Sequence, residues 1–332
     1  MRKRYERPPS RIGKLRLEAL AVLLFLPAAC ERPKPATAAA PPLRIIVPAA
    51  GKTVSETYPP FSLPTEPVKR GVFEQINRDR AENGAAPVAW DEAASQVADA
   101  FCTAQVAEKT RGHYLRDGVP PYARTGLAGV FGYQSENSAS WLTTASSISE
   151  TPLVLALSAE RTMMEEKPPA DGHRVSILDP EATHVGVGWA MGGGRFQLAE
   201  EFLARGLESL NVRAEEGAAI LHFSGQARAP LKLEFVTIAH EALPGNLTRA
   251  EANDRTFYKY PVPHEAFVPE GRIDLTVVGT ATRDRIRLAG DRRFSFAFAP
   301  GEPGLFTFVF WFGSDAGDRP RPGGSAVAKV ES

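Results

Sequence analysis

The stretch DGHRVSILDPEATHVGVG, residues 171–188, places a histidine shortly before a β-prone run. It follows Pro168 and Pro169, which end a preceding helix because each proline lacks a backbone N–H and restricts the residue before it. His173 is therefore predicted to lie at a helix exit, in a turn that can aim its side chain into a cleft, and a surface histidine beside the turn is the alternative interpretation of this segment. The Val-Gly-Val-Gly run at the end belongs to a strand, because no helix follows at the spacing of a phosphate-binding loop.

The residues around this stretch mix helical and strand patterns. Upstream, apolar residues recur at helical spacing in a segment that ends at Asn83-Gly84 and in another that opens at Asp91, a good N-cap. A third helix is predicted from Ser146 to Glu166, whereas residues 111–141 contain too many glycines and prolines for regular structure. Two β-prone runs joined by three glycines predict a hairpin: THVGVGWAM (183–191) and RFQLAEEFL (195–203).

Beyond residue 207 the helical patterns disappear. Short alternating runs bounded by Gly, Pro, Asp and Asn take their place, which is typical of an antiparallel sandwich. We expect an all-β, Ig-like sandwich over residues 206–332, built from AAILHFSGQA (218–227), LKLEFVTIAH (231–240), GRIDLTVVGTA (271–281), DRIRLAG (284–290), RFSFAFAP (293–300), GLFTFVFWFG (304–313) and a last strand, AVAKVE (326–331).

Length and charge limit the class of protein. The 332 residues are enough for two domains of about 150 residues each. Lys+Arg and Asp+Glu both number 39, so the formal net charge is zero. A nucleic-acid-binding protein needs a surplus of basic residues to neutralise phosphates, so no nucleic-acid partner is expected.

The first 30 residues predict export. A basic segment, residues 1–16, precedes the apolar run LEALAVLLFLPAAC, which is too short to span a bilayer of about 30 Å and suits a signal peptide. The run resembles a bacterial lipoprotein processing site in which Cys30 is lipidated and becomes the mature N-terminus. Cleavage near residues 36–40 and an uncleaved anchor are the alternatives. With Cys30 lipidated, only Cys102 remains, and it is predicted to be a buried small side chain.

Residues 31–67 are rich in proline and alanine and show no sustained period, so they are predicted to form a tether. Together with the signal peptide and Cys30, the tether predicts a lipoprotein of the cell membrane or outer membrane. Without lipidation, the protein is expected in the periplasm or outside the cell.

Four segments in order resemble the CAP superfamily, the SCP-like extracellular domain, in its bacterial form. They are INRDRAENGAAPVAWDE (76–92), GHYLRDGVPPYAR (112–124), SENSA (135–139) and DGHRVSILDPEATHVGVG (171–188). The resemblance covers residues 68–205 and implies a CAP-type α-β-α sandwich, so the whole chain is expected to be an α/β domain followed by the all-β domain.

The resemblance also implies a cleft that holds two histidines and two acidic residues. His113 in GHY matches the first histidine, Glu136 in SEN the first acid and His173 in GHR the second histidine. The helix end MMEEKPP matches the segment that supplies the second acid, which is Glu166 or, if the alignment shifts by one residue, Glu165.

Such a set of side chains has two chemical interpretations. His113 and His173 converging on one point can share zinc or another divalent metal, with the carboxylates as ligands or as orienting partners. Without metal, the same groups form a hydrogen-bonded cluster that titrates near neutral pH. No nucleophile is visible, and Ser135 is the only nearby hydroxyl, with no base assignable to it.

Three functions therefore remain open. In the first, the cleft binds a metal or small ligand, and the tethered protein recognises an unknown ligand or protein of the cell envelope. In the second, the protein is a metal-assisted hydrolase or peptidase in which a glutamate takes a proton from bound water. In the third, the cleft is vestigial and the protein is structural or binds partners through its β domain.

Three more residues near these segments have expected roles. Arg174 is predicted to hold its loop by pairing with an acidic neighbour such as Asp171 or Asp179, and the alternative is that it lines the cleft and meets an anionic ligand. Arg124 and Tyr122 are weaker candidates for the rim of the cleft.

Overall fold

The computed structural model describes residues 43–47, 54–55, 63–144, 148–215, 218–272, 277, 280–290, 292–314 and 319–332. All of them belong to one compact unit, Pro41–Ser332. The predicted signal peptide and Cys30 lie outside the described residues. Within the described part of the chain, no helix combines the length and the apolar character needed to cross a bilayer.

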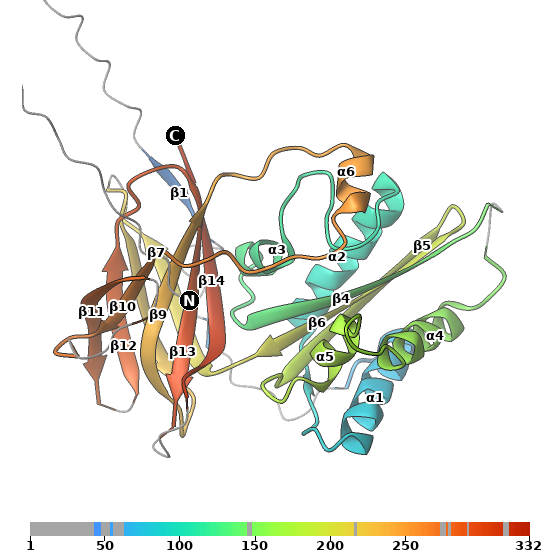
Figure 1. The fold of residues 1–332 in the computed structure, drawn as a ribbon, viewed down its shortest axis with the longest axis horizontal. Helices are drawn as coiled ribbons and strands as arrows, with labels where there is room; N and C mark the ends of the chain where they lie inside the picture. Colours follow the sequence, from blue (N-terminus) through green and yellow to red (C-terminus); the bar gives the residue numbers. More distant parts are fainter. Residues whose placement is uncertain are drawn as a thin grey trace, which may run out of the picture. The chain divides into compact units, whose positions relative to one another are not determined.

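The first domain is a four-stranded sheet between two layers of helices, as expected. The strand order is β3-β5-β6-β4, so β4 is an edge strand. Helix α2 packs on one face, and α1, α4 and α5 pack on the other (Figure 1). The elements are α1 (Pro67–Glu82), β3 (Ala89–Trp90), α2 (Glu92–Glu108), α3 (Pro121–Leu127), β4 (Tyr133–Leu142), α4 (Pro152–Met164), α5 (Gly172–Leu178), β5 (His184–Gly192) and β6 (Arg195–Ala204).

Several of these elements were predicted from their local sequence signals. Helix α1 is capped at its C-terminus by Asn83, and α2 begins after Asp91, whose side chain accepts a hydrogen bond from the amide of Ala94 at 2.8 Å. The hairpin β5–β6 is confirmed. Helix α4 begins later than the predicted Ser146, because Thr151 caps it and a proline occupies its first turn.

Two sequence-based expectations were wrong. Residues 111–141 are not irregular, since they contain α3 and most of β4. Their prolines start α3, where a missing N–H costs nothing. His173 does not lie in a loop but in the first turn of α5, a helix of seven residues that gives too weak a periodic signal to be recognised.

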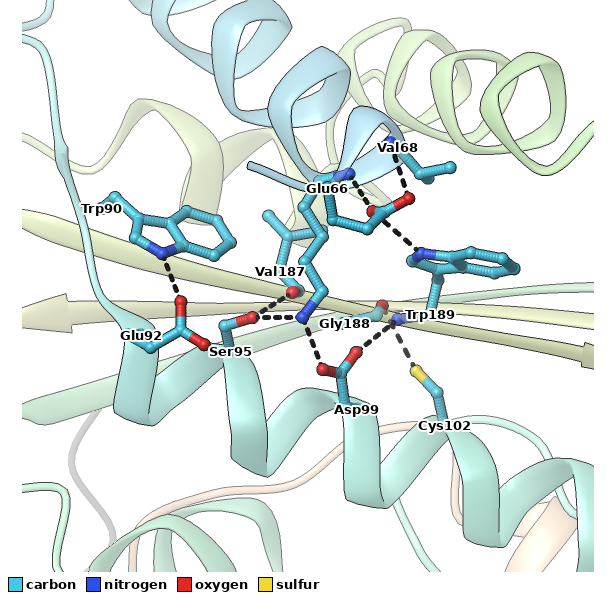
Figure 2. A network of polar contacts seen from close by, with 11 residues as sticks. Glu66, Val68, Trp90, Glu92, Ser95, Asp99, Cys102, Val187, Gly188 and Trp189 are labelled. Carbon is cyan, nitrogen blue, oxygen red and sulfur yellow. Dashed lines mark hydrogen bonds and ion pairs between the residues drawn. The ribbon is translucent and has the colours of Figure 1, made fainter. Parts of the chain in front are cut away.

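The two glycines of the Val-Gly-Val-Gly run allow α2 to lie directly on β5. A β carbon at Gly186 would overlap the backbone of Ser95, and one at Gly188 would overlap the backbone of Ala98. The close approach lets Ser95 Oγ donate to the carbonyl oxygen of Val187 at 2.7 Å (Figure 2). Side-chain-free positions in the strand therefore fix the distance between helix and sheet.

A polar network joins α1 to the same region (Figure 2). Lys69 Nζ donates to Asp99 Oδ2 at 2.5 Å and to Ser95 Oγ at 2.9 Å. Glu66 caps the start of α1 and accepts a hydrogen bond from Trp189 Nε1 at 3.2 Å. Helices from opposite faces of the sheet are thus tied to β5 by the same contacts.

The second domain is built from strands, as expected, with one short helix, α6 (Arg249–Asp254), in a connection between them. Its ten strands follow the order β1-β14-β13-β9-β10-β11-β12-β8-β7-β2, and its two halves enclose one aromatic-rich core. They are β7 (Leu207–Ala214), β8 (Leu221–Ala227), β9 (Lys232–Glu241), β10 (Glu265–Pro269), β11 (Ala281–Ala289), β12 (Arg293–Phe298), β13 (Gly304–Gly313) and β14 (Arg321–Glu331), with β1 and β2 described below. The run GRIDLTVVGTA falls mostly outside the described residues, and β7 and β10 were not predicted.

The two end strands of this sheet come from the segment predicted to be a tether. Strand β1 (Arg44–Ile46) pairs with β14, and β2 (Val54–Ser55) pairs with β7. Part of residues 31–67 therefore belongs to the folded sheet. Three residues of alternating character are too few to mark a strand without knowledge of its partner.

Arg80 joins α1 to the segment that carries α5. It is fully buried, and its guanidinium donates to four carbonyl oxygens, those of Ala86, Ile177, Asp179 and Ala182. Burial lowers the pKa of Arg80, and nearby Asp179 opposes that shift. One buried cation thus joins the loop after α1 to the end of α5 and to the loop that follows it.

Replacing Arg80 by methionine is expected to lower the free energy of unfolding by about 3 kcal/mol or more, because buried carbonyl groups lose their donors. Urea denaturation of the Arg80→Met variant measures this loss. Arg78→Met, at an exposed position of the same helix, is the matched control and should change stability by less than about 0.5 kcal/mol. Equal effects in the two variants would contradict the assignment.

Candidate functional site

All four side chains expected in the cleft line one cavity of about 750 Å³. The cavity lies at edge strand β4, between α5 and residues 256–260 of the second domain. His113 follows the end of α2, Glu136 lies on β4, Glu166 follows α4, and His173 lies on α5. Four separate elements thus bring the side chains together.

His113 and Glu136 form the buried half of the site. His113 Nδ1 lies 2.8 Å from Glu136 Oε1, and the other carboxylate oxygen of Glu136 accepts a hydrogen bond from Arg124. Burial, helped by Arg124, lowers the pKa of His113 to about 4, so the ring is neutral at physiological pH. We assign the ring proton to Nδ1, which donates it to Glu136.

Glu166 and His173 form the half-exposed part of the site. Glu166 Oε1 lies 2.5 Å from His173 Nδ1, and Oε2 accepts the backbone N–H of His173 at 3.1 Å. The carboxylate therefore fixes both the start of α5 and the orientation of the ring. Glu165 is exposed and has no contact of this kind.

The two histidines reach β4 from opposite layers of the sandwich. Successive residues of a strand point to opposite faces. Glu136 accordingly meets His113 and Arg124 on the α2 side, whereas the neighbouring Asn137 donates to the backbone oxygen of His173 at 3.2 Å on the α5 side. Because β4 is an edge strand, groups from both faces of the sheet can approach each other around its open side.

Two pairs of buried carboxyl groups lie next to the site. On β6, Glu201 interacts with Glu136, and Glu200 interacts with Glu160 of α4 on the other face. Burial raises the pKa of all four carboxyl groups, most strongly in Glu160 and Glu201. Neither oxygen of Glu160 has a hydrogen-bond partner among the described residues, and the nearby carboxyl groups of Glu200 and Asp79 add to the effect of burial on its pKa.

A segment of the second domain covers one side of the cavity. We call residues 242–264 the strap: it leaves β9, contains helix α6 (Arg249–Asp254) and returns to β10 (orange in Figure 1). The amide of Glu136 donates to the hydroxyl of Tyr258 at 2.5 Å, and the amide of Gln134 donates to that of Tyr260 at 2.9 Å. The ring of Tyr258 also packs edge-on against His113, with centroids 5.0 Å apart.

Sequence reasoning missed the strap. The predicted strands left residues 241–270 without an assignment, and a connection of that length in a compact domain usually has a function. The alternating Tyr258 and Tyr260, followed by prolines, indicated an extended segment but not its partner.

The other candidates take structural roles. Arg174 donates to the carbonyl oxygen of Met164 at 2.7 Å and to Asn83 Oδ1 at 2.8 Å, and not to Asp171 or Asp179 as expected.

Of the expected rim residues, Arg124 is nearly buried beneath Glu136. Tyr122 is buried and donates to Glu241 Oε2 at 2.5 Å, so it does not reach the rim. Ser135 lines the cavity, and none of the described contacts joins it to a base.

His113 and His173 are the side chains of the cavity that could hold a divalent cation. Each imidazole is oriented by a carboxylate on Nδ1, which is the usual support of zinc-binding histidines, and Nε2 has no partner among the described residues. The described residues contain no group of three or more His, Cys, Asp and Glu side chains that could enclose an ion. His113 and His173 would thus leave the remaining positions to water or a ligand.

The pair Glu160–Glu200 predicts a dependence of stability on pH. The folded state holds a proton that the unfolded chain releases above its ordinary pKa of about 4.3, so stability is lost as the pH rises beyond that value. The loss is about 1.4 kcal/mol for each pH unit over which the folded group stays protonated.

The Glu160→Gln variant cannot ionise and keeps a donor for Glu200, so its stability should fall less between pH 5 and pH 8 in urea denaturation. The exposed Glu165→Gln variant should follow the parent. If the parent and Glu160→Gln differ in stability by the same amount at pH 5 and at pH 8, Glu160 is charged in the folded state and the prediction is wrong.

Comparison with known proteins supports the fold. The family model described as CAP, the cysteine-rich secretory protein family, matches residues 73–203. No match was found among curated proteins.

Several solved structures are similar to part of this chain at low sequence identity. An outer surface protein of Borrelia burgdorferi is 14% identical, with a TM-score of 0.35, over 43% of this chain and 96% of its own. An extracellular SCP-domain protein of Bacillus anthracis is 18% identical, with a TM-score of 0.32, over 42% and 41%. Venom allergen-like protein 4 of Schistosoma mansoni is 12% identical, with a TM-score of 0.30, over 42% and 88%.

The matched residues include three sides of the cavity, namely His113, Glu136 and the Glu166–His173 pair, and exclude the strap. Over residues 73–203 the chain therefore carries a CAP domain of the cysteine-rich secretory protein family.

Proposed function

We propose that this protein is exported, is anchored to a membrane through a lipid on Cys30, and binds a divalent metal or small ligand at the cell envelope in the cleft between His113 and His173. The observation that carries the proposal is the pairing of each imidazole with its own carboxylate around one cavity. Such pairing orients both rings and leaves the Nε2 atom of each one available to a ligand.

The same geometry favours binding over hydrolysis. Both oxygens of Glu136 are occupied, by His113 and Arg124, and both oxygens of Glu166 are occupied by His173. Each carboxylate oxygen thus already accepts a hydrogen bond that positions a ring, an arginine or the start of α5, which is the role of an orienting group. A bound metal would supply a Lewis acid that polarises a ligand, while the two carboxylates hold the rings in place.

Calorimetric titration of zinc into the purified protein is expected to show binding that the His113→Ala/His173→Ala double variant loses. His264→Ala, an exposed histidine outside the cavity, is the matched control and should bind as the parent does.

Glu166→Gln removes the charge behind one ligand and should weaken zinc binding by about 10- to 100-fold. Equal zinc binding by the parent and the double variant would refute a metal site at these histidines. Binding of a small ligand would then be the remaining part of the proposal.

Lipid attachment has a separate test. In a bacterial host, a fatty-acid analogue should label the parent, and Cys30→Ser should abolish the label and release the protein from the membrane fraction. Cys102→Ala, at the buried cysteine, should leave both unchanged. A Cys30→Ser protein that stays with the membrane would indicate an uncleaved anchor.

A further inference from the structure

The strap places an exposed aromatic ring beside the cleft. Tyr260 stacks between Tyr122 and Tyr133, with ring centroids 4.7 and 4.4 Å away, which fixes this end of the strap on the CAP domain. Tyr258 is held by the amide of Glu136. Phe257 is 70% exposed although it lines the cavity.

The anchored tyrosines make this exposure a feature of the site. The ammonium group of Lys259 lies 5.9 Å from the centroid of the Phe257 ring, which is otherwise largely exposed. An aromatic ring gains free energy when it is covered, so this fixed segment offers the ring to a ligand. Val262, which is also exposed, lies in the same strap but does not line the cavity.

The lining of the cavity limits the chemistry of its ligand. Aromatic, hydroxyl, amide and carboxyl side chains form it, and among the described lining residues no aliphatic side chain is larger than that of Ala170. The apolar surface is aromatic and lies among polar groups, so it suits a ligand with a flat apolar face and hydroxyl groups better than a flexible acyl chain. Lys259 is the only basic lining residue besides the histidines, which argues against a polyanion.

An extended peptide also fits poorly. A peptide that adds a strand to an edge needs free backbone groups on that edge. The outward amides of Gln134 and Glu136 already donate to the strap's tyrosine hydroxyls.

We propose that the cleft binds a neutral oligosaccharide, with one sugar ring stacked on Phe257 of the strap. A sugar ring has an apolar C–H face that covers an aromatic side chain, while its hydroxyl groups exchange hydrogen bonds with serine, amide and imidazole groups such as those of Ser135, Ser176 and the two histidines. The inference rests on the proposed function, since it names the ligand class of the same cleft, and it assigns part of that ligand's recognition to the second domain.

The test is a calorimetric titration of the purified protein with the trimers of glucose and of N-acetylglucosamine, and with trialanine as the peptide probe. At least one trisaccharide should bind. Phe257→Ala should weaken that binding by about tenfold or more, and Phe257→Tyr should retain it, because the ring face is kept. Val262→Ala is the matched control and should bind as the parent does.

The inference is overturned if neither trisaccharide binds, if Phe257→Ala weakens binding no more than Val262→Ala does, or if trialanine binds more tightly than both sugars. Zinc titration of the same samples separates the two proposals. Zinc binding that depends on the histidines, without saccharide binding, removes only the saccharide inference, whereas the absence of both also removes the metal site of the proposed function.

Discussion

The close approach of α2 to β5 is the contact on which the rest of the first domain depends. It exists because Gly186 and Gly188 carry no β carbon, so the helix backbone rests on the strand and Ser95 bonds directly to it. A helix held at that distance delivers the chain to His113 at a fixed point above the sheet edge. A larger residue at Gly186 or Gly188 would push α2 away from the strand and displace one side of the cleft.

The site illustrates how a protein can use a sheet edge that would otherwise be a liability. An open edge strand presents unpaired backbone groups and invites unwanted association. Here β4 is covered on the α2 side by His113 and Arg124, on the other side by α5, and along the edge by the hydroxyl groups of Tyr258 and Tyr260. The cleft is the gap that this covering leaves.

How far the sequence could predict the structure depended on where each element's stabilising partners lie. Helices α1 and α2 and the β5–β6 hairpin carry their own periodicity and caps, so their patterns were sufficient. Strand β4 shows no apolar alternation. Its buried polar residues have partners in other elements, such as Arg124 and Glu201, and these partners cannot be recognised from the strand's own sequence.

The same reasoning explains the other differences. Helix α5 is too short to show a period, and Arg80 fixes it by bonding to its carbonyl groups. The candidate site residues came from the family resemblance, which contains nothing about the strap, and the cavity's remaining wall was therefore invisible from the sequence.

The position of the strap in the chain sets the order in which the site is completed. The core of the CAP domain is finished once β6 has been synthesised, but the outward amides of β4 have only water as a partner until Tyr258 and Tyr260 follow. A ribosome that stops between the two domains would release a compact CAP domain with an open edge and a cleft lacking one wall. The cleft therefore gains its last wall only after the second domain has been synthesised.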